Sequence, residues 1–196
     1  MSIELIIAVV VILGLIFYLI SIYNKLVSLK NRVDNGWAQI DVQLQRRYDL
    51  IPNLVETAKG YMKHEKETLK MVIDARNSAN DAAKAASGNP SDQNAIKDLQ
   101  ASEQKLQGAM MSFQALAEGY PDLKANTNML ALQEELATTE NKVGFSRQAF
   151  NDAVMQYNTG IEIFPNSLIA NQFKFTQATE WQIEDQEAKK NVKVTF

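Results

Sequence analysis

The feature that most constrains the fold is an uninterrupted apolar stretch near the N-terminus. From Leu5 to Ile20 the chain reads LIIAVVVILGLIFYLI without a charged residue, and the apolar character continues to position 23. About 20 apolar helical residues are needed to cross roughly 30 Å of bilayer hydrocarbon. We therefore predict a short N-terminal tail (residues 1–4) followed by a transmembrane helix (residues 5–23).

The residues on either side of this stretch predict whether it is cleaved and how it is oriented in the membrane. No basic residue precedes it, and Ser21-Ile22-Tyr23-Asn24 offers no pair of small residues, so the sequence does not read as a cleaved signal peptide. Lys25, Lys30 and Arg32 follow directly. Because basic residues favour the cytoplasmic side, we expect a single-pass cell-membrane protein with Met1 outside and the following domain in the cytoplasm.

Beyond the stretch, apolar residues recur at steps of three and four, which is the pattern of amphipathic helices. The first such series continues the apolar stretch without a break, and Pro52 then predicts a turn with a second helix from about Ile51. Further breaks are expected at Gly88-Asn89-Pro90, where Asn89 or Ser91 can cap the next helix, at Gly119-Tyr120-Pro121-Asp122, and at Pro165.

These segments predict an all-α fold. With only 8 Gly and 4 Pro in 196 residues, the composition favours long helices over a turn-rich β fold. Four helices with short connections pack antiparallel, so we expect a long four-helix bundle over residues 24–164, with the transmembrane helix continuous with its first helix. Residues 165–196 form a separate, aromatic-rich C-terminal segment and tail.

The same composition argues against several functions. A net charge of −3 with mixed signs does not suit nucleic acid, and the absence of Cys removes thiolate chemistry and disulfides. The single His64 lies in His-Glu-Lys-Glu-Thr, where a zinc protease motif needs a second His at Thr68. We expect no catalytic, cofactor-binding or metal-binding residue, although a Ser–Lys dyad stays open.

Two groups of residues are candidates for a structural or binding role. Polar residues close to the apolar seams either lie at the surface or form a network that sets helix register, in which Arg147 bridges Asp34 or Glu140. The predicted network is Asp34, Glu140, Arg147 and Asn151, and the wider polar set adds Asn35, Arg46, Arg47 and Asn158.

The C-terminal segment is the second group. Antiparallel packing returns it towards the bilayer, where it can contact the membrane interface or a partner, or instead cap the bundle. The candidate surface is Phe164, Leu168, Ile169, Phe173, Phe175, Trp181 and Phe196.

The chain resembles the LemA family over nearly its whole length. The block YNKLVSLKNRVDNGWAQIDVQLQRRYDLIPNLVETAKGYMKHEKETL (Tyr23–Leu69) and the later AEGYPDLKANTNMLALQEELATTENKVGFSRQAFNDAVMQYNTGIEIFPNSLIA carry the resemblance in order. It implies a transmembrane helix with a short outer N-terminus, a helical bundle and a bacterial cell membrane, and it implies no activity.

Three functions follow as hypotheses. The first is a non-enzymatic, self-associating adaptor or scaffold that contacts the lipid bilayer and other envelope proteins. The second is a signalling or envelope-stress module in which the anchor helix moves. The third, ranked last, is an envelope hydrolase that uses Arg147 or Glu140.

Overall fold

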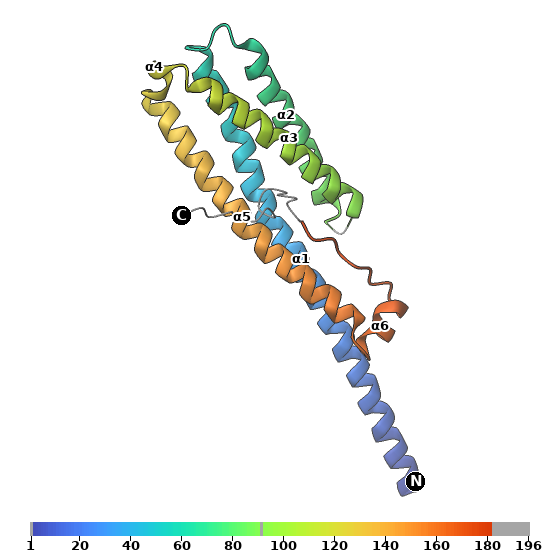
Figure 1. The fold of residues 1–196 in the computed structure, drawn as a ribbon. Helices are drawn as coiled ribbons and strands as arrows, with labels where there is room; N and C mark the ends of the chain where they lie inside the picture. Colours follow the sequence, from blue (N-terminus) through green and yellow to red (C-terminus); the bar gives the residue numbers. More distant parts are fainter. Residues whose placement is uncertain (1, 91, 182–196) are drawn as a thin grey trace, which may run out of the picture.

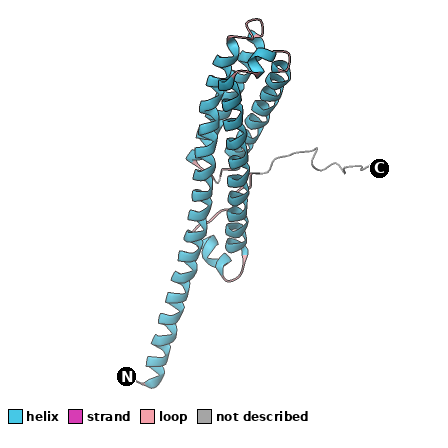
Figure 2. Cartoon of the chain, turned by 90° about the vertical axis from the view of Figure 1, so that its left-hand side faces the viewer, coloured by secondary structure: helices cyan, strands magenta, loops and turns pink. Residues whose placement is uncertain are grey.

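The chain is helical apart from short connections and the segment that follows the last helix, as Figure 2 shows for the computed structural model, which describes residues 2–90 and 92–181. No strand occurs within those residues, so the expected all-α class is confirmed. The helices are α1 (Ile3–Lys59), α2 (Lys66–Gly88), α3 (Gln93–Ala117), α4 (Pro121–Lys124), α5 (Thr127–Glu162) and α6 (Asn166–Gln172).

The long helices pack as two pairs. Figure 1 shows α1 as the axis of the molecule, with α5 running back along it and α2 and α3 paired at the end far from the N-terminus. α5 packs chiefly on α1, α3 packs chiefly on α2, and α1 also contacts α2. The buried residues of α1 from Ile22 to Ala58 keep helical spacing along the side that these partners cover.

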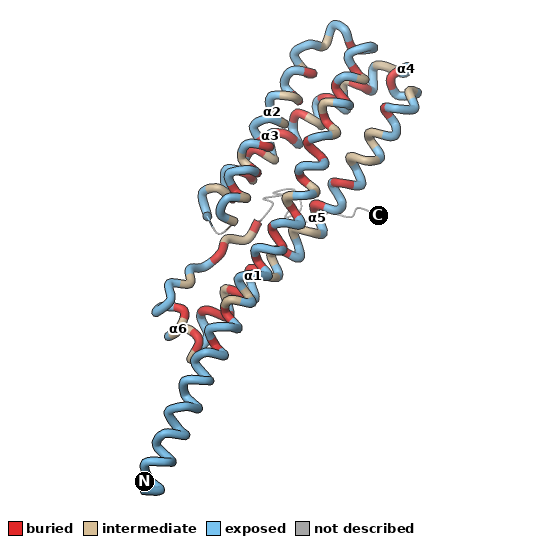
Figure 3. The backbone as a smooth tube through the Cα atoms, turned by 180° about the vertical axis from the view of Figure 1, so that it is seen from behind, coloured by how far each residue is buried: buried red, intermediate tan, exposed pale blue. Residues whose placement is uncertain are grey.

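The first third of α1 projects beyond the other helices. Its residues up to Ser21 are exposed, and this part appears uniformly pale blue in Figure 3. Among the described residues, α1 is the one helix with a stretch apolar and long enough to cross a membrane. A soluble domain seldom exposes so large an apolar surface.

The turn expected near Pro52 does not form, because α1 continues through it to Lys59. A proline lacks the N–H that bonds the carbonyl four residues earlier, which here is the carbonyl of Tyr48. Arg76 of α2 takes that place, since its Nε donates to the Tyr48 carbonyl oxygen at 2.8 Å. A neighbouring helix thus satisfies the group that the proline leaves unpaired.

The first break therefore falls later than expected. The chain turns between Gly60 and Glu65, and exposed His64 lies in this turn and not on a helix. The Gly88–Pro90 break is observed, but Asp92 caps α3: its Oδ1 accepts from Asn94 N at 2.8 Å. α5 ends at Glu162, shortly before Pro165.

Two glycines allow α1 and α5 to approach closely. A Cβ atom added to Gly36 of α1 would lie 3.2 Å from the Phe150 Cα of α5, and one added to Gly160 of α5 would lie 2.6 Å from Leu29 Cδ1 of α1. Gly160 is buried inside α5 and marks a contact between helices. The lack of a side chain leaves room for Phe150 at Gly36 and for Leu29 at Gly160.

Candidate functional site

A cleft opens where α3 and α5 stand apart over α1. Its volume is about 320 Å³, and we call it the α1–α3–α5 cleft. Ile51 and Leu54 of α1 contribute to its apolar lining, while Met110 and Met111 lie on the α3 side. Glutamines contribute much of its polar lining: Gln100, Gln104, Gln107, Gln114 and Gln133.

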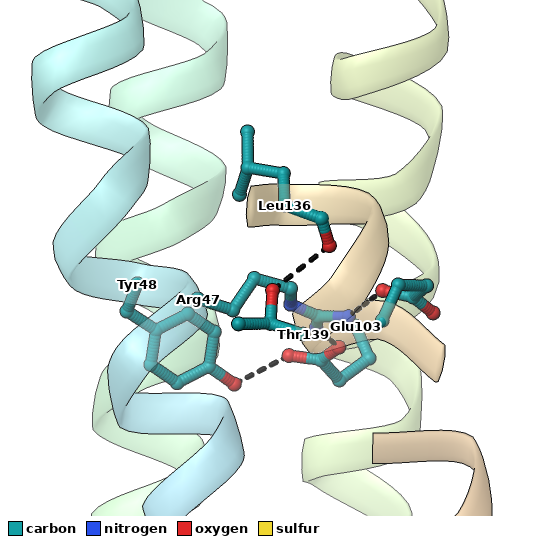
Figure 4. A network of polar contacts seen from close by, with 6 residues as sticks. Arg47, Tyr48, Glu103, Leu136 and Thr139 are labelled. Atoms are coloured by element: carbon teal, nitrogen blue, oxygen red, sulfur yellow. Dashed lines mark hydrogen bonds and ion pairs between the residues drawn. The ribbon is translucent and has the colours of Figure 1, made fainter. Parts of the chain in front are cut away.

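Arg47 is the centre of a polar network at one end of this cleft. Its side chain is only 10% exposed and forms ion pairs with Glu103 of α3 and Glu140 of α5. The Tyr48 hydroxyl donates to the same Glu103, and Figure 4 shows the Tyr48 and Arg47 side chains converging on it. Burial raises the pKa of Tyr48 to about 12, although Arg47 opposes the shift. The network ties three helices together at one level.

The hydroxyl of Thr139 on α5 is buried beside this network. Thr139 is fully buried, and its Oγ1 donates to the Leu136 carbonyl oxygen at 2.8 Å (Figure 4). The hydroxyl can be buried without losing its hydrogen bond because a carbonyl oxygen of its own helix is the acceptor.

Arg147, which the sequence placed in a bridging role, lines the cleft without forming that bridge. Arg47 takes the ion pair with Glu140, and no ion pair of Arg147 occurs among the described residues. Burial lowers the pKa of Arg147, while the charge of Glu140 opposes that shift. Asp34 is exposed, and after burial it is the second cause that raises the pKa of Tyr157. The structure therefore brings Arg147 and Glu140 near each other but not Asp34.

Asn151 and Asn158 of α5 hold the segment that follows α6. Asn151 Nδ2 donates to the Trp181 carbonyl oxygen at 3.0 Å, and Trp181 N donates back to Asn151 Oδ1 at 2.8 Å. Asn158 pairs with Ala178 in the same two-way manner at 2.9 Å and 2.9 Å. Asn151 and Asn158 are seven residues apart on α5, a rise of about 10.5 Å, and Ala178 and Trp181 are three residues apart in an extended segment of about the same length. Both pairs can therefore form at the same time. We call residues 174–181 the strap.

The strap carries Trp181 to the cleft. Trp181 is 3% exposed and lines the cleft, and its ring lies 5.9 Å from that of Trp37, measured between centroids. The Trp37 ring in turn packs edge-on against Phe150 at 5.6 Å. Trp181 is therefore part of the core in this structure.

The remaining residues of the predicted C-terminal surface divide into two environments. Ile169 and Phe175 are partly buried against the core. Phe164, Leu168 and Phe173 are exposed at 80%, 61% and 57%. Phe196 lies outside the described residues.

Three participants in the Arg47 network or its surroundings were not predicted. Glu103, Tyr48 and Arg76 sit on helical faces whose neighbours come from other helices, and no local motif marks them. Arg47 was noted only as one of several polar residues near the seam. Within residues 2–90 and 92–181, no group of three or more His, Asp or Glu side chains is arranged to hold a metal ion.

Comparison with known proteins gives consistent results. The sequence profile of the LemA family matches residues 36–196. The protein LemA of Metamycoplasma hominis is 24% identical to this chain over 157 residues, which cover 79% of this chain and 67% of that protein.

Proposed function

Because this chain belongs to the LemA family, we propose that it is a membrane-anchored helical adaptor of the bacterial cell envelope, with α1 as a single transmembrane span. Residues 5–23 lie within the bilayer, Met1 is outside, and the domain is cytoplasmic. The exposed Lys25, Lys30 and Arg32 directly after the apolar run support this orientation. The four long helices form the antiparallel bundle that the adaptor presents.

The observation that carries the adaptor role is the α1–α3–α5 cleft. From Gln100 to Gln114 on α3, and from Gln133 to Arg147 on α5, each wall extends over about 21 Å at 1.5 Å per residue. That length accommodates about four turns of helix. The apolar floor between polar walls suits an amphipathic helix, and flexible methionines such as Met110 adapt to varied partners.

Charge indicates what this partner helix carries. Arg47 is neutralised by two carboxylates, whereas Arg147 faces the cleft region without an ion pair among the described residues. Burial already disfavours the charged form of Arg147, as its lowered pKa reflects. An acidic side chain on the incoming helix offsets that cost, so the occupant is an amphipathic helix with a carboxylate at the level of Arg147.

Photo-crosslinking tests this function. A photoreactive phenylalanine analogue replaces Met111, which lines the cleft and is 62% exposed, or Met155, which is 54% exposed on α5 and does not line it. In cells that produce the full chain, we expect one envelope protein to crosslink at Met111 and not at Met155. Arg147→Glu should weaken that crosslink at least tenfold, and reversing the charge of the partner's acidic residue should restore it.

Other outcomes overturn the role of the cleft. Equal adducts at both positions, or a yield that Arg147→Glu leaves unchanged, contradict a helix seated beside Arg147. Adducts only with a second copy of the chain replace the adaptor with a self-assembling scaffold. Self-association itself stays a prediction, which size analysis of the crosslinked full chain in detergent checks.

One observation favours signalling as a second candidate. α1 is unbroken from the apolar stretch to Lys59, so movement of the span is transmitted to the Arg47 network. Because the chain has no Cys, disulfide scanning between α1 and α5 has no background. A single pattern of crosslinks under all growth conditions contradicts this candidate.

A further inference from the structure

The short helix α6 and its two flanking aromatic residues form a compact, exposed apolar projection beside α1. We call this element, residues 164–173, the α6 foot. Phe164, Leu168 and Phe173 are its most exposed large side chains. In Figure 1 the foot lies beside α1, where α1 emerges from the rest of the molecule.

The foot is held firmly in place although these three side chains are exposed. Asn166 is buried and its Nδ2 donates to the Gly160 carbonyl oxygen at 3.0 Å, which fastens α6 to the end of α5. On the other side, Phe175 N donates to the Ala170 carbonyl oxygen at 2.9 Å, and Ala170 is 2% exposed. The foot also packs on both α1 and α5. Its exposed side chains are therefore presented by a fixed scaffold.

Aromatic contacts fix the height of the foot along α1. The ring of Tyr23 lies 4.8 Å from the ring of Phe173 and 5.9 Å from that of Phe175, measured between centroids. Counted from Ile3, the helix rises about 30 Å to Tyr23, which equals the thickness of the bilayer hydrocarbon. The first basic residue follows at Lys25. With residues 5–23 spanning the bilayer as proposed, the foot would stand at the level where hydrocarbon meets the lipid headgroups.

We propose that the α6 foot is a second membrane contact, in which Phe164, Leu168 and Phe173 enter the interface of the same bilayer that α1 crosses. Phe and Leu side chains are favoured at this depth because the apolar face of an interfacial helix buries such residues at the boundary between headgroups and acyl chains. Continuity with the lipid-facing surface of α1 identifies lipid as the occupant. Two contacts also fix the tilt of the domain, which a single span leaves free.

This inference rests on the transmembrane span of the proposed function, but not on the cleft. The chain has no Cys, so single cysteines can carry a nitroxide spin label without background. The three sites are Leu168→Cys on the foot, Phe145→Cys on α5, and Phe17→Cys in the apolar stretch. Phe145 and Phe17 are 75% and 70% exposed, so neither label disturbs the core. Phe145 stands about 26 Å before the end of α5 and serves as the matched control.

The full chain is placed in vesicles of phosphatidylethanolamine and phosphatidylglycerol. Accessibility of each label to oxygen, which concentrates in lipid, is compared with accessibility to a water-soluble nickel chelate. We expect the oxygen-to-nickel ratio at Leu168 to be at least threefold higher than at Phe145 and lower than at Phe17.

The possible outcomes separate the two proposals. If Phe17 is lipid-accessible and Leu168 matches Phe145, the membrane contact of the foot is wrong and the span stands. If Phe17 is water-accessible, the span fails and the inference fails with it. If Leu168 is shielded from both reagents, protein covers the foot, which overturns lipid as the occupant.

Discussion

The two-way pairing between Asn151 and Trp181 makes a quantitative prediction. Asn151→Ala removes two hydrogen bonds, of 3.0 Å and 2.8 Å, that hold the strap against α5. Such bonds contribute about 0.5–1.5 kcal/mol each, so their loss costs roughly 1–3 kcal/mol. Alanine is the better helix former and returns up to about 0.7 kcal/mol. The net loss is therefore about 0.3–2.3 kcal/mol, concentrated on the strap.

Hydrogen exchange of the full chain in detergent measures this loss where it occurs. Each 1.4 kcal/mol is a tenfold change in an equilibrium, so the Trp181 amide should exchange roughly two- to fortyfold faster in Asn151→Ala. The Ala178 amide keeps its bond to Asn158 and should change less. Asn141→Ala is the control, because Asn141 is exposed on the same helix. Unchanged exchange at Trp181, or an equal effect of Asn141→Ala, refutes the reasoning.

Three further predictions concern stability, measured by chemical denaturation of the full chain in detergent. Arg76→Ala should cost about 1–3 kcal/mol by leaving the Tyr48 carbonyl unpaired, and less in a Pro52→Ala background, where the restored amide bonds that carbonyl. An additive double-mutant cycle contradicts this. Gly36→Leu should cost about 1–3 kcal/mol or more by forcing α5 away from α1, whereas Gly144→Ala, with open space around it, should stabilise by up to about 1 kcal/mol. Burial raises the pKa of Tyr48 from 10.0 to about 12, so the neutral phenol contributes fully to the free energy of unfolding below pH 10 and this contribution is lost as pH rises towards 12. Tyr48→Phe should therefore reduce the loss of stability between pH 10 and pH 12.

The all-helical fold could be predicted from the sequence because helical periodicity is local. The repeat of apolar residues and the breaks at Gly88 and near Pro165 each depend on a few neighbouring positions. The same local rule failed at Pro52. The carbonyl that Pro52 leaves unpaired accepts a hydrogen bond from the guanidinium of Arg76. Arg76 belongs to another helix, and the sequence alone does not indicate that the two groups are in contact.

The candidate network shows the same limit for side chains. Asn151 is half-buried, and its polar partner is the backbone of Trp181 and not a side chain of another helix. Arg47 and Arg147 both lie near apolar seams, yet only Arg47 reaches Glu140 as an ion pair. Neighbouring positions on a helix point about 100° apart, so such a choice depends on helix rotation, which spacing alone does not determine.

The pairing of α1 with α5 also sets the order in which the chain can mature on the ribosome. The buried face of α1 is complete once Lys59 is made, but its main partner is not finished until Glu162. At roughly 5–20 residues per second, the intervening synthesis lasts about 5–20 s. During that interval α1 has only α2 to shelter part of its apolar face, so we expect the nascent protein to depend on chaperones or on early capture by the membrane.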